Sequence, residues 1–324
     1  MPILSVRNLS IDYVSADAVR HAVVDVSFDL EKGRSLGLVG ESGCGKTTTM
    51  LSLMRLLPAE GRIVGGEIRF DGLDLLRLSE AEMRAFRWRR MAIVFQGAMN
   101  ALNPVRRIDD QIIEAITLHM PSYDRRKARL RAGELMEIVG IAPERARQYP
   151  HQFSGGMRQR AMIAMALACN PDVLIADEPT TALDVMIQAQ ILTLLEDLQA
   201  QLGLSVILVT HDLGVVAEVC DDVLIMYGGK VAEYGDVDTI FNAPRHPYTQ
   251  RLLQAFPDVD APSRVLASIP GHPPPLNALP PGCRFEPRCH LASDLCRQVA
   301  PVERALAPGH IVACHHAETS ELSR

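Results

Sequence analysis

Short runs rich in Val, Ile and Leu alternate along the chain with longer stretches of helical periodicity. The runs at 173–176 and 206–209 are uninterrupted and apolar, which is typical of strands buried on both faces of a parallel sheet. The earlier runs alternate more, as strands of an antiparallel sheet do when one face meets solvent. The pattern therefore predicts an α/β fold with an antiparallel β subdomain. The predicted strands cover residues 4–6, 23–28, 36–39, 63–70, 91–95, 173–176, 206–209, 223–226 and 230–234.

The middle of the chain predicts helices. The interval 97–153 contains no convincing strand, and we expect a helical subdomain over about residues 97–170. Apolar residues there recur with the spacing of one helix face, which predicts an amphipathic helix that ends at Gly140. These apolar residues are Ala132, Leu135, Met136 and Val139.

The composition changes after residue 256. Residues 257–282 hold eight prolines, a density that neither a helix nor a central strand accepts, so we predict an extended linker there. Four of the seven cysteines follow this segment. We therefore predict two parts, a large domain at 1–256 and a small proline-rich, Cys-rich C-terminal extension at 257–324.

Length and charge narrow the class of protein. A chain of 324 residues can build one large or two modest domains, and a net charge of −6 gives no electrostatic reason to expect nucleic acid as a partner. The N-terminus lacks the charged-then-apolar pattern of a secretory signal, and no apolar run approaches the ~20 residues that span a bilayer. We expect a soluble cytoplasmic protein whose membrane role, if any, comes through partner subunits.

Residues 40–47 match the phosphate-binding loop G-x-x-x-x-G-K-[ST] in full. An apolar strand precedes the loop and a helical stretch from Thr47 to Leu57 follows it, as the motif requires. The glycines let backbone N–H groups surround phosphate oxygens, Lys46 reaches the β- and γ-phosphates, and the Thr47 hydroxyl holds Mg²⁺. The predicted nucleotide site consists of Gly40, Glu41, Ser42, Gly43, Cys44, Gly45, Lys46, Thr47 and Thr48.

Cys44 allows two interpretations. It lies in the phosphate loop at a helix N-terminus, an environment that lowers the pKa of a thiol, so its oxidation or alkylation would block ATP binding. Alternatively, Cys44 is a small residue that contributes only its backbone N–H.

Two acids end the buried strand at 173–176. A carboxylate at a strand tip beside the phosphate loop is a suitable Mg²⁺ ligand, which assigns Asp177 to the metal. Glu178 then orients or deprotonates the attacking water. The alternative is an ordinary strand end with two solvated acids.

Ser154, Gly155 and Gly156 open a strongly apolar helix. A hydroxyl and two glycines at a helix N-terminus form a second anion site, although Ser154 could simply be an N-cap that precedes flexible glycines. Two phosphate-binding helix starts in one chain indicate that each nucleotide is held by two molecules or by two halves of a dimer.

Four late cysteines suggest a metal centre. In a cytoplasmic protein disulfides are disfavoured, and four thiolates suit zinc or an iron–sulfur cluster. Zinc sites favour closely spaced pairs, which are missing here, so the open spacing favours a [4Fe–4S] cluster; zinc and unliganded thiols stay as alternatives. The cysteines are Cys283, Cys289, Cys296 and Cys314.

In order and approximate spacing, the segments 40–47, 154–156 and 177–178 resemble those of ABC-type ATPase domains, a resemblance that covers about residues 3–240. It implies a P-loop NTPase fold of ABC type, with an antiparallel β subdomain and a helical subdomain, and a head-to-tail dimer that sandwiches two ATP molecules with Mg²⁺. It also implies roles for four further residues. Tyr13 would stack on adenine, Gln96 would contact Mg²⁺ or water, Asp184 would link the two sites, and His211 would touch the γ-phosphate.

The segments 103–104, 150–157 and 243–249 narrow the resemblance to the ATPases of dipeptide and oligopeptide importers. It implies ATP hydrolysis that energises peptide import from the cytoplasmic face of a membrane. The implied partners are a second ATPase subunit, with a heterodimer favoured, two transmembrane permease subunits and an extracytoplasmic substrate-binding protein. Related systems carry nickel, sugars or opines, and such ATPases with this cysteine pattern resemble carriers of a [4Fe–4S] cluster.

The signature departs from the usual Leu-Ser-Gly-Gly-Gln of the family, because Phe153 and Met157 replace its first and last residues. The Ser154 hydroxyl and the glycine N–H groups remain, so we expect binding to survive.

A soluble ABC ATPase that acts on DNA or ribosomes is the alternative class. Chromosome ATPases of this kind insert long coiled coils, whereas the interval from Gln96 to Ser154 has room only for a compact helical subdomain. Translation factors of this kind typically fuse two ATPase domains, and this chain has one phosphate loop. Transport is therefore favoured.

Overall fold

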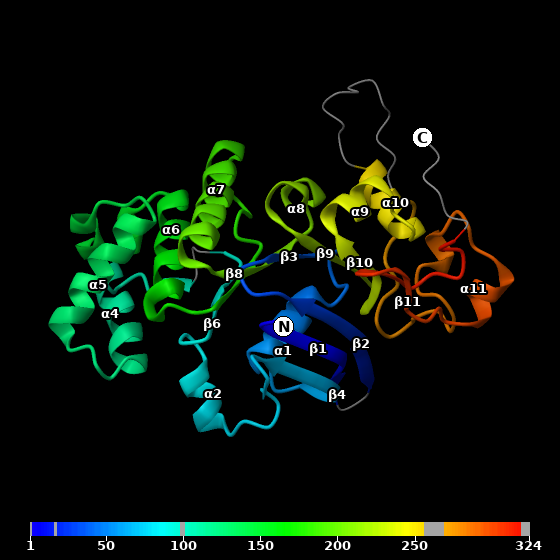
Figure 1. The fold of residues 1–324 in the computed structure, drawn as a ribbon, viewed down its shortest axis with the longest axis horizontal. Helices are drawn as coiled ribbons and strands as arrows, with labels where there is room; N and C mark the ends of the chain where they lie inside the picture. The colour runs from blue at the N-terminus through cyan, green and yellow to red at the C-terminus, as the bar shows by residue number, and fades with distance from the viewer. Residues whose placement is uncertain (1, 16–17, 98–100, 256–268, 319–324) are drawn as a thin grey trace. The chain divides into compact units, whose positions relative to one another are not determined.

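The computed structural model describes residues 2–15, 18–97, 101–255 and 269–318, and it divides the chain into two compact units (Figure 1). The first unit comprises Met1–Glu31, Ser35–Arg77 and Val209–Arg324. The second comprises Lys32–Arg34 and Leu78–Leu208.

The first unit contains the predicted antiparallel sheet. Its four strands lie in the order β2-β1-β4-β5, and every neighbouring pair is antiparallel. Buried apolar residues alternate with exposed polar ones along much of β1, which explains why its pattern was legible in the sequence. The bounds are β1 (Leu4–Val14), β2 (Val19–Leu30), β4 (Gly61–Phe70) and β5 (Leu73–Asp74).

A second set of strands in the first unit lies in the order β11-β12-β10-β9-β3. Only β3 and β9 pair in parallel, and β3, which leads into the phosphate loop, is buried at every residue. The strands are β3 (Ser35–Val39), β9 (Asp222–Tyr227), β10 (Lys230–Asp236), β11 (Arg304–Ala307) and β12 (His310–Val312). The helices of this unit are α1 (Lys46–Leu53), α8 (Leu213–Val219), α9 (Val237–Asn242), α10 (Pro247–Gln254), η4 (Glu286–Arg288) and α11 (Asp294–Gln298).

The core of the first unit joins segments that are distant in sequence. Tyr227 of β9, Tyr248 of α10 and Phe285 of the C-terminal extension are buried together, with ring centroids 4.7–5.3 Å apart. Val39, the last residue of β3, belongs to the same cluster, and Cys283 and Cys289 pack against it. The end of the phosphate-loop strand and residues that follow the predicted linker therefore share one hydrophobic core.

The second unit combines buried strands with most of the helices. β6 and β7 pair in parallel, β8 is the next neighbour of β7, and both β7 and β8 are buried throughout, as predicted. The strands are β6 (Met91–Val94), β7 (Val173–Asp177) and β8 (Ser205–Thr210), of which the last two residues are counted in the first unit. The helices are α2 (Glu80–Phe86), α4 (Ile108–His119), α5 (Arg125–Ile138), η1 (Pro143–Arg147), η2 (Pro150–Gln152), α6 (Gly155–Ala166), η3 (Leu167–Cys169) and α7 (Val185–Leu202).

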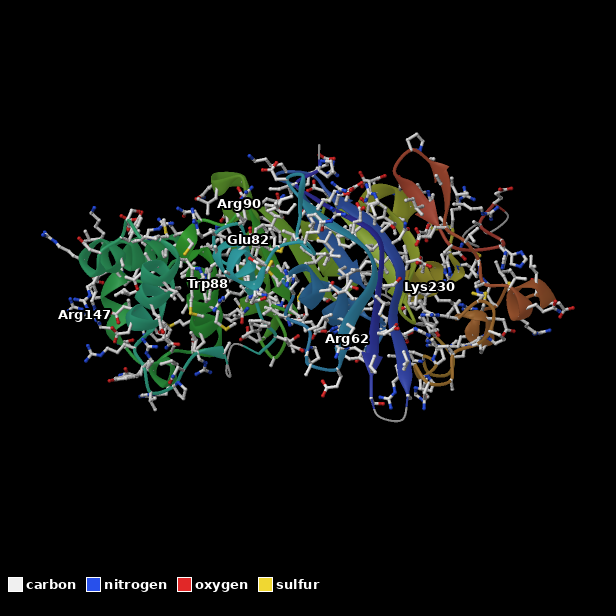
Figure 2. All side chains as sticks on the ribbon, turned by 90° about the horizontal axis from the view of Figure 1, so that it is seen from below. Arg62, Glu82, Trp88, Arg90, Arg147 and Lys230 are labelled. Carbon is white, nitrogen blue, oxygen red and sulfur yellow. The ribbon has the colours of Figure 1, made fainter. Side chains whose placement is uncertain are left out.

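Local signals and one long-range bond fix the elements near β6. Ser79 and Glu82 form a reciprocal capping box at the start of α2. The indole N–H of Trp88 donates to the carbonyl of Met165 in α6 at 2.8 Å. Glu82 and Trp88 are labelled among the side chains in Figure 2. Trp88, the single tryptophan, is therefore hydrogen-bonded to α6, the signature helix that begins after Ser154.

Most predicted elements are confirmed, with differences at their ends. The amphipathic helix is α5, which ends at Ile138 just before Gly140, whose φ is +72°. α1 ends at Leu53, four residues before the predicted end at Leu57, and β11 and β12 were not predicted. In the described part of 97–153 there is no strand.

The predicted linker is described only in part. Residues 257–268 lie outside the described residues, and residues 269–282 form neither helix nor strand, as their proline content predicts. Within the described ranges, none of the helices combines the length and apolarity that crossing a membrane requires.

Candidate nucleotide site

The phosphate loop has a backbone that only glycine adopts readily. Gly43 and Gly45 have φ of +80° and +104°. A Cβ on Gly40 would lie 2.3 Å from the carbonyl oxygen of Met226, and one on Gly45 would lie 2.9 Å from that of Ala22. The loop therefore keeps its glycines for conformation and for close packing, and α1 begins immediately after it at Lys46.

Lys46 is buried, and its ammonium group lies across the loop. Nζ donates to the carbonyl oxygens of Gly40 at 2.5 Å and of Glu41 at 3.2 Å. These two carbonyls open the loop, so the ammonium is oriented toward the space that the loop encloses. A phosphate group bound at this position would receive the greatest electrostatic stabilisation from the Lys46 ammonium.

Tyr13 and Thr48 lie together in the first unit. The Tyr13 hydroxyl is 3.2 Å from Thr48 Oγ1, which brings the predicted adenine-stacking residue next to the helix that follows the loop. Thr47 precedes Thr48 on the same turn of α1. His211 follows β8 as an exposed residue, and the next residue, Asp212, caps α8 by accepting from the N–H groups of Gly214 and Val215.

The structure favours the second interpretation of Cys44. The thiol is buried, and this burial raises its pKa although Lys46 acts in the opposite direction. The backbone N–H of Cys44 donates to the carbonyl of Glu41 at 3.2 Å. The interpretation of Cys44 as a low-pKa reactive thiol is therefore wrong, because desolvation of the buried thiol outweighs the effect of Lys46.

The second unit brings Gln96 and Glu178 together from positions far apart in the sequence. Gln96 Nε2 donates to Glu178 Oε2 at 2.5 Å, and Thr181 Oγ1 donates to the same oxygen at 2.9 Å. Glu178 has a φ of +44°, a strained value for a residue with a side chain, directly after the buried Asp177 at the end of β7. Thr181 was missed from the sequence, although a hydroxyl three residues after the acid is a usable signal.

At the signature helix the glycines have a packing role. Ser154 is the N-cap of α6, and its Oγ accepts from the N–H of Met157 at 3.3 Å. A Cβ on Gly156 would lie 2.6 Å from Cγ2 of Ile187 in α7, whereas one on Gly155 would only touch Leu183. Asp184 caps α7 by accepting from the Ile187 N–H at 3.0 Å. Gly156 is thus required by the close approach of α6 and α7.

The residues predicted to bind Mg²⁺ all carry oxygen donors. Thr47 belongs to the first unit, and Asp177 and Gln96 belong to the second. Their hydroxyl, carboxylate and amide oxygens are the hard donors that Mg²⁺ prefers, so the donor set fits this ion.

The four late cysteines lie in the first unit, and none of the seven cysteines forms a disulfide. The N–H groups of Leu291 and His316 donate to the sulfur atoms of Cys289 and Cys314 at 3.4 and 3.3 Å. Burial raises the pKa of Cys314 to about 12, and the neighbouring cysteines add to this shift.

No metal site is preformed by these thiols. Among the described residues, no group of three or more His, Cys, Asp or Glu side chains is arranged to hold a metal ion. Electrostatic interactions link the sulfur atoms of the four late cysteines, and backbone N–H groups donate to two of these sulfurs.

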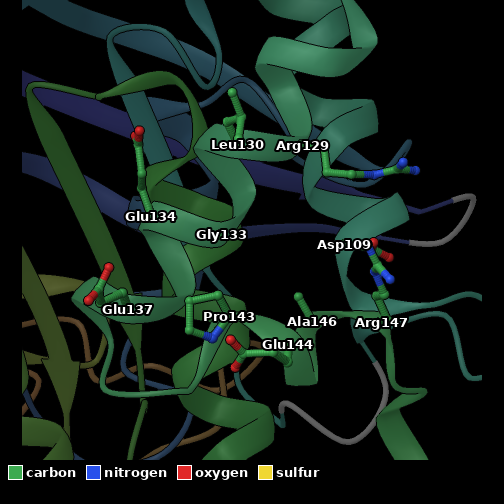
Figure 3. A pocket seen from close by; sticks show the side chains of 10 residues that line it. All are labelled: Asp109, Arg129, Leu130, Gly133, Glu134, Glu137, Pro143, Glu144, Ala146 and Arg147. Carbon is green, nitrogen blue, oxygen red and sulfur yellow. The ribbon is translucent and has the colours of Figure 1, made fainter.

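A groove of about 490 Å³ lies between α4, α5 and η1 of the second unit (Figure 3). Arg129 and Arg147 line it together with Glu134, Glu137 and Glu144. None of the residues predicted to bind nucleotide or metal lines this groove. It is therefore a surface feature of the helical region and no part of the candidate site.

Comparisons with known proteins agree with this geometry. A family described as ABC transporter matches residues 23–181, and one described as oligopeptide/dipeptide transporter, C-terminal region, matches residues 232–296. A probable peptide ABC transporter ATP-binding protein of Sinorhizobium fredii is 49% identical over 96% of this chain and 94% of its own. The dipeptide transport ATP-binding protein of Bacillus subtilis is 48% identical over 96% and 94%, and the oligopeptide transport ATP-binding protein of Haemophilus influenzae is 46% identical over 97% of each chain.

Solved structures share the fold. A dimeric ATP-binding cassette in a post-hydrolysis state with ADP and phosphate aligns with a TM-score of 0.65 and 27% identity, over 72% of this chain and 98% of its own. The protein cbiO1 of Clostridium perfringens, part of the ABC transporter complex cbiONQ, aligns with a TM-score of 0.64 and 28% identity, over 74% of this chain and 90% of its own.

Proposed function

The chain belongs to the ABC transporter family of ATP-binding subunits, and from this premise we propose that it energises a membrane importer of dipeptides or oligopeptides. It is an ATP-hydrolysing transport subunit. The observation that carries the peptide assignment is the similarity of almost the whole chain, including the C-terminal region, to subunits named for peptide transport. The same similarity favours transport over a soluble ATPase that acts on DNA or ribosomes.

The residues divide the work of ATP hydrolysis between them. The N–H groups of the loop and the Lys46 ammonium bind the phosphates. The oxygens of Thr47 and Asp177 would hold Mg²⁺, which would neutralise phosphate charge. Glu178 accepts a proton from, or orients, the attacking water. Gln96 and Thr181 both donate to one carboxylate oxygen of Glu178, so they fix the direction in which the carboxylate points.

Reconstitution tests the peptide assignment. The chain is assembled in proteoliposomes with two permease subunits, a second ATPase subunit and the substrate-binding protein, and ATP-dependent uptake of a labelled oligopeptide is compared with that of nickel. Uptake of peptide alone supports the proposal. Uptake of nickel with exclusion of peptide refutes the substrate while leaving the transport ATPase intact.

Two ATPase subunits form the composite site in this proposal. Each ATP lies between the phosphate loop of one subunit and the Ser154 helix start of the other, with Tyr13 at adenine, His211 at the γ-phosphate and Asp184 linking the two sites. The N-cap geometry at Ser154 supports this arrangement, because the loss of the usual signature residues at Phe153 and Met157 leaves the hydroxyl and the helix N-terminus in position. We favour a heterodimer with a homologous ATPase.

Sedimentation velocity distinguishes the forms of assembly. A Glu178→Gln chain with ATP and Mg²⁺ should stay monomeric alone and form a dimer when the homologous subunit is added. A stable homodimer would contradict the heterodimer. In the cell this assembly lies on the cytoplasmic face of the membrane, attached through the permeases.

The four late cysteines are proposed to hold a [4Fe–4S] cluster, with zinc as the alternative. The ligands would be Cys283, Cys289, Cys296 and Cys314, in an extension at 257–324 that follows an ATPase domain at 1–256 with its helical subdomain at about 97–170. The extension has few large apolar residues, so metal ligation would supply folding free energy that a small core lacks.

Anaerobic purification tests the metal. Iron content and absorbance in the cluster band are measured for the wild-type chain and for Cys289→Ser, and iron with colour that the variant loses supports the cluster. A colourless, iron-free protein with stoichiometric zinc overturns it.

A further inference from the structure

Glu41 is the second residue of the phosphate loop, a position where the motif accepts any residue. Its carboxylate nevertheless makes a specific contact. Arg288 Nη1 lies 2.6 Å from Glu41 Oε2, and Arg288 Nη2 lies 3.0 Å from Glu41 Oε1, so the two planar groups form a two-bond fork. The Arg288 side chain is only 5% exposed and that of Glu41 is 27% exposed. The loop is thus tied to a residue 247 positions away in the C-terminal extension.

Arg288 is itself held from several directions. Its Nε donates to the carbonyl oxygen of Pro270 at 2.8 Å, and Nη1 donates to the Tyr227 hydroxyl at 3.2 Å. Its guanidinium carbon lies 5.8 Å from the centroid of the Tyr227 ring. A guanidinium with this many fixed partners cannot follow a displaced carboxylate, so Arg288 acts as an anchor.

The backbone of Glu41 is fixed as well. Its N–H donates to the hydroxyl of Tyr248 in α10 at 3.0 Å, and the Tyr248 ring is buried in the core cluster with Tyr227 and Phe285. Its carbonyl accepts from Lys46 Nζ at 3.2 Å. One loop residue therefore joins the C-terminal extension, α10 and the phosphate-binding lysine.

We propose that Arg288 and Tyr248 are positioning residues for ATP, which hold Glu41 so that the phosphate loop and Lys46 keep their binding geometry before the nucleotide arrives. This inference rests on ATP binding by the loop. When the loop is already ordered, ATP binding does not have to order it and loses less conformational entropy. When the contacts are removed, binding must order the loop, and the affinity for ATP falls. Arg288 also neutralises a carboxylate beside the site for a triphosphate, so its loss adds repulsion to disorder.

The experiment measures the Kd for MgATP of the purified full-length chain by displacement of a fluorescent ATP analogue. Arg288→Met should raise the Kd about tenfold, and Tyr248→Phe, which removes only one hydroxyl, about fivefold. Arg288→Lys should restore less than half of the MgATP affinity that Arg288→Met loses, because an ammonium cannot form the two-bond fork. In the assembled transporter the variants should raise KM for MgATP, while kcat should stay within about twofold of the wild-type value.

Arg297→Met is the matched control. Arg297 lies in the same extension, where it forms ion pairs with Glu286 and Asp294, and its side chain is 60% exposed. It should bind MgATP as the wild-type chain does. Thermal unfolding identifies the folded fraction of each variant, so that the Kd refers to folded protein.

The outcomes are distinct. An unchanged Kd for folded Arg288→Met and Tyr248→Phe, or an equal rise for Arg297→Met, overturns the inference. If Arg288→Met fails to fold, Tyr248→Phe decides alone, because it keeps the ring and the extension. Failure of the wild-type chain to bind MgATP would instead refute the proposed function itself.

Discussion

Replacing His246 by asparagine should make the stability of the first unit less sensitive to acid. His246 is buried at the start of α10, where its Nδ1 accepts from the N–H of Tyr248 at 3.0 Å. The backbone N–H of His246 donates to the fully buried carboxylate of Glu233 at 3.0 Å. Asparagine is also a good N-cap and does not titrate, so the substitution removes the proton-binding group while keeping the cap.

The magnitude follows from the pKa of His246. Burial lowers this pKa from 6.5 to about 4, although the charge of Glu233 acts in the opposite direction. Between these two values the unfolded chain binds a proton that the folded chain refuses, so the free energy of unfolding falls as the pH falls. The loss amounts to ~2 kcal/mol by pH 5 and ~3 kcal/mol by pH 4, since one pH unit corresponds to about 1.4 kcal/mol.

Urea unfolding at pH 7.5, 6 and 5 measures this effect for the wild-type chain and for His246→Asn. Near-UV circular dichroism follows the tyrosines, of which four of six lie in the first unit, while Trp88 fluorescence follows the second unit separately. At pH 7.5 the free energy of unfolding of His246→Asn should be lower than that of the wild-type chain, because asparagine fills less of the core. On acidification the variant should lose less of this free energy than the wild-type chain loses. Parallel curves for the two proteins from pH 7.5 to 5 would refute the reasoning.

Three further substitutions test the site and the core. Glu178→Gln should retain MgATP binding and lower kcat of the assembled transporter by at least ~100-fold, measured as phosphate release, and turnover at the wild-type rate would contradict its role. Ser154→Ala removes the acceptor for the Met157 N–H and should lower the free energy of unfolding by ~1 kcal/mol, read from Trp88 fluorescence, with Ser154→Asn as the control that keeps a cap. Phe285→Ala should lower the free energy of unfolding, measured by thermal unfolding, by ~3–5 kcal/mol, because it leaves a cavity in an aromatic cluster. Phe285→Leu should lower it less, and equal losses for the two variants would argue against a packing role.

The sequence by itself determined the features whose physics is local. Alternating and uninterrupted apolar runs identified the strands, and the glycine spacing at 40–47 identified the phosphate loop. Both signals are local, because backbone freedom and periodicity depend on neighbours within a few residues. The end of α5 before Gly140 follows from the same local rules. The short strands β11 and β12 were not predicted from the sequence, because they contain too few residues to show a period.

Tertiary structure alone decided the environment of each side chain. The contact of Gln96 with Glu178 spans 82 residues, the burial that raises the pKa of Cys44 comes from the packed loop, and the need for glycine at 156 comes from Ile187 on another helix. The fork between Glu41 and Arg288 spans 247 residues, and neither residue carries a local signal for it. Desolvation and close approach depend on which distant segments meet, and periodicity does not encode that.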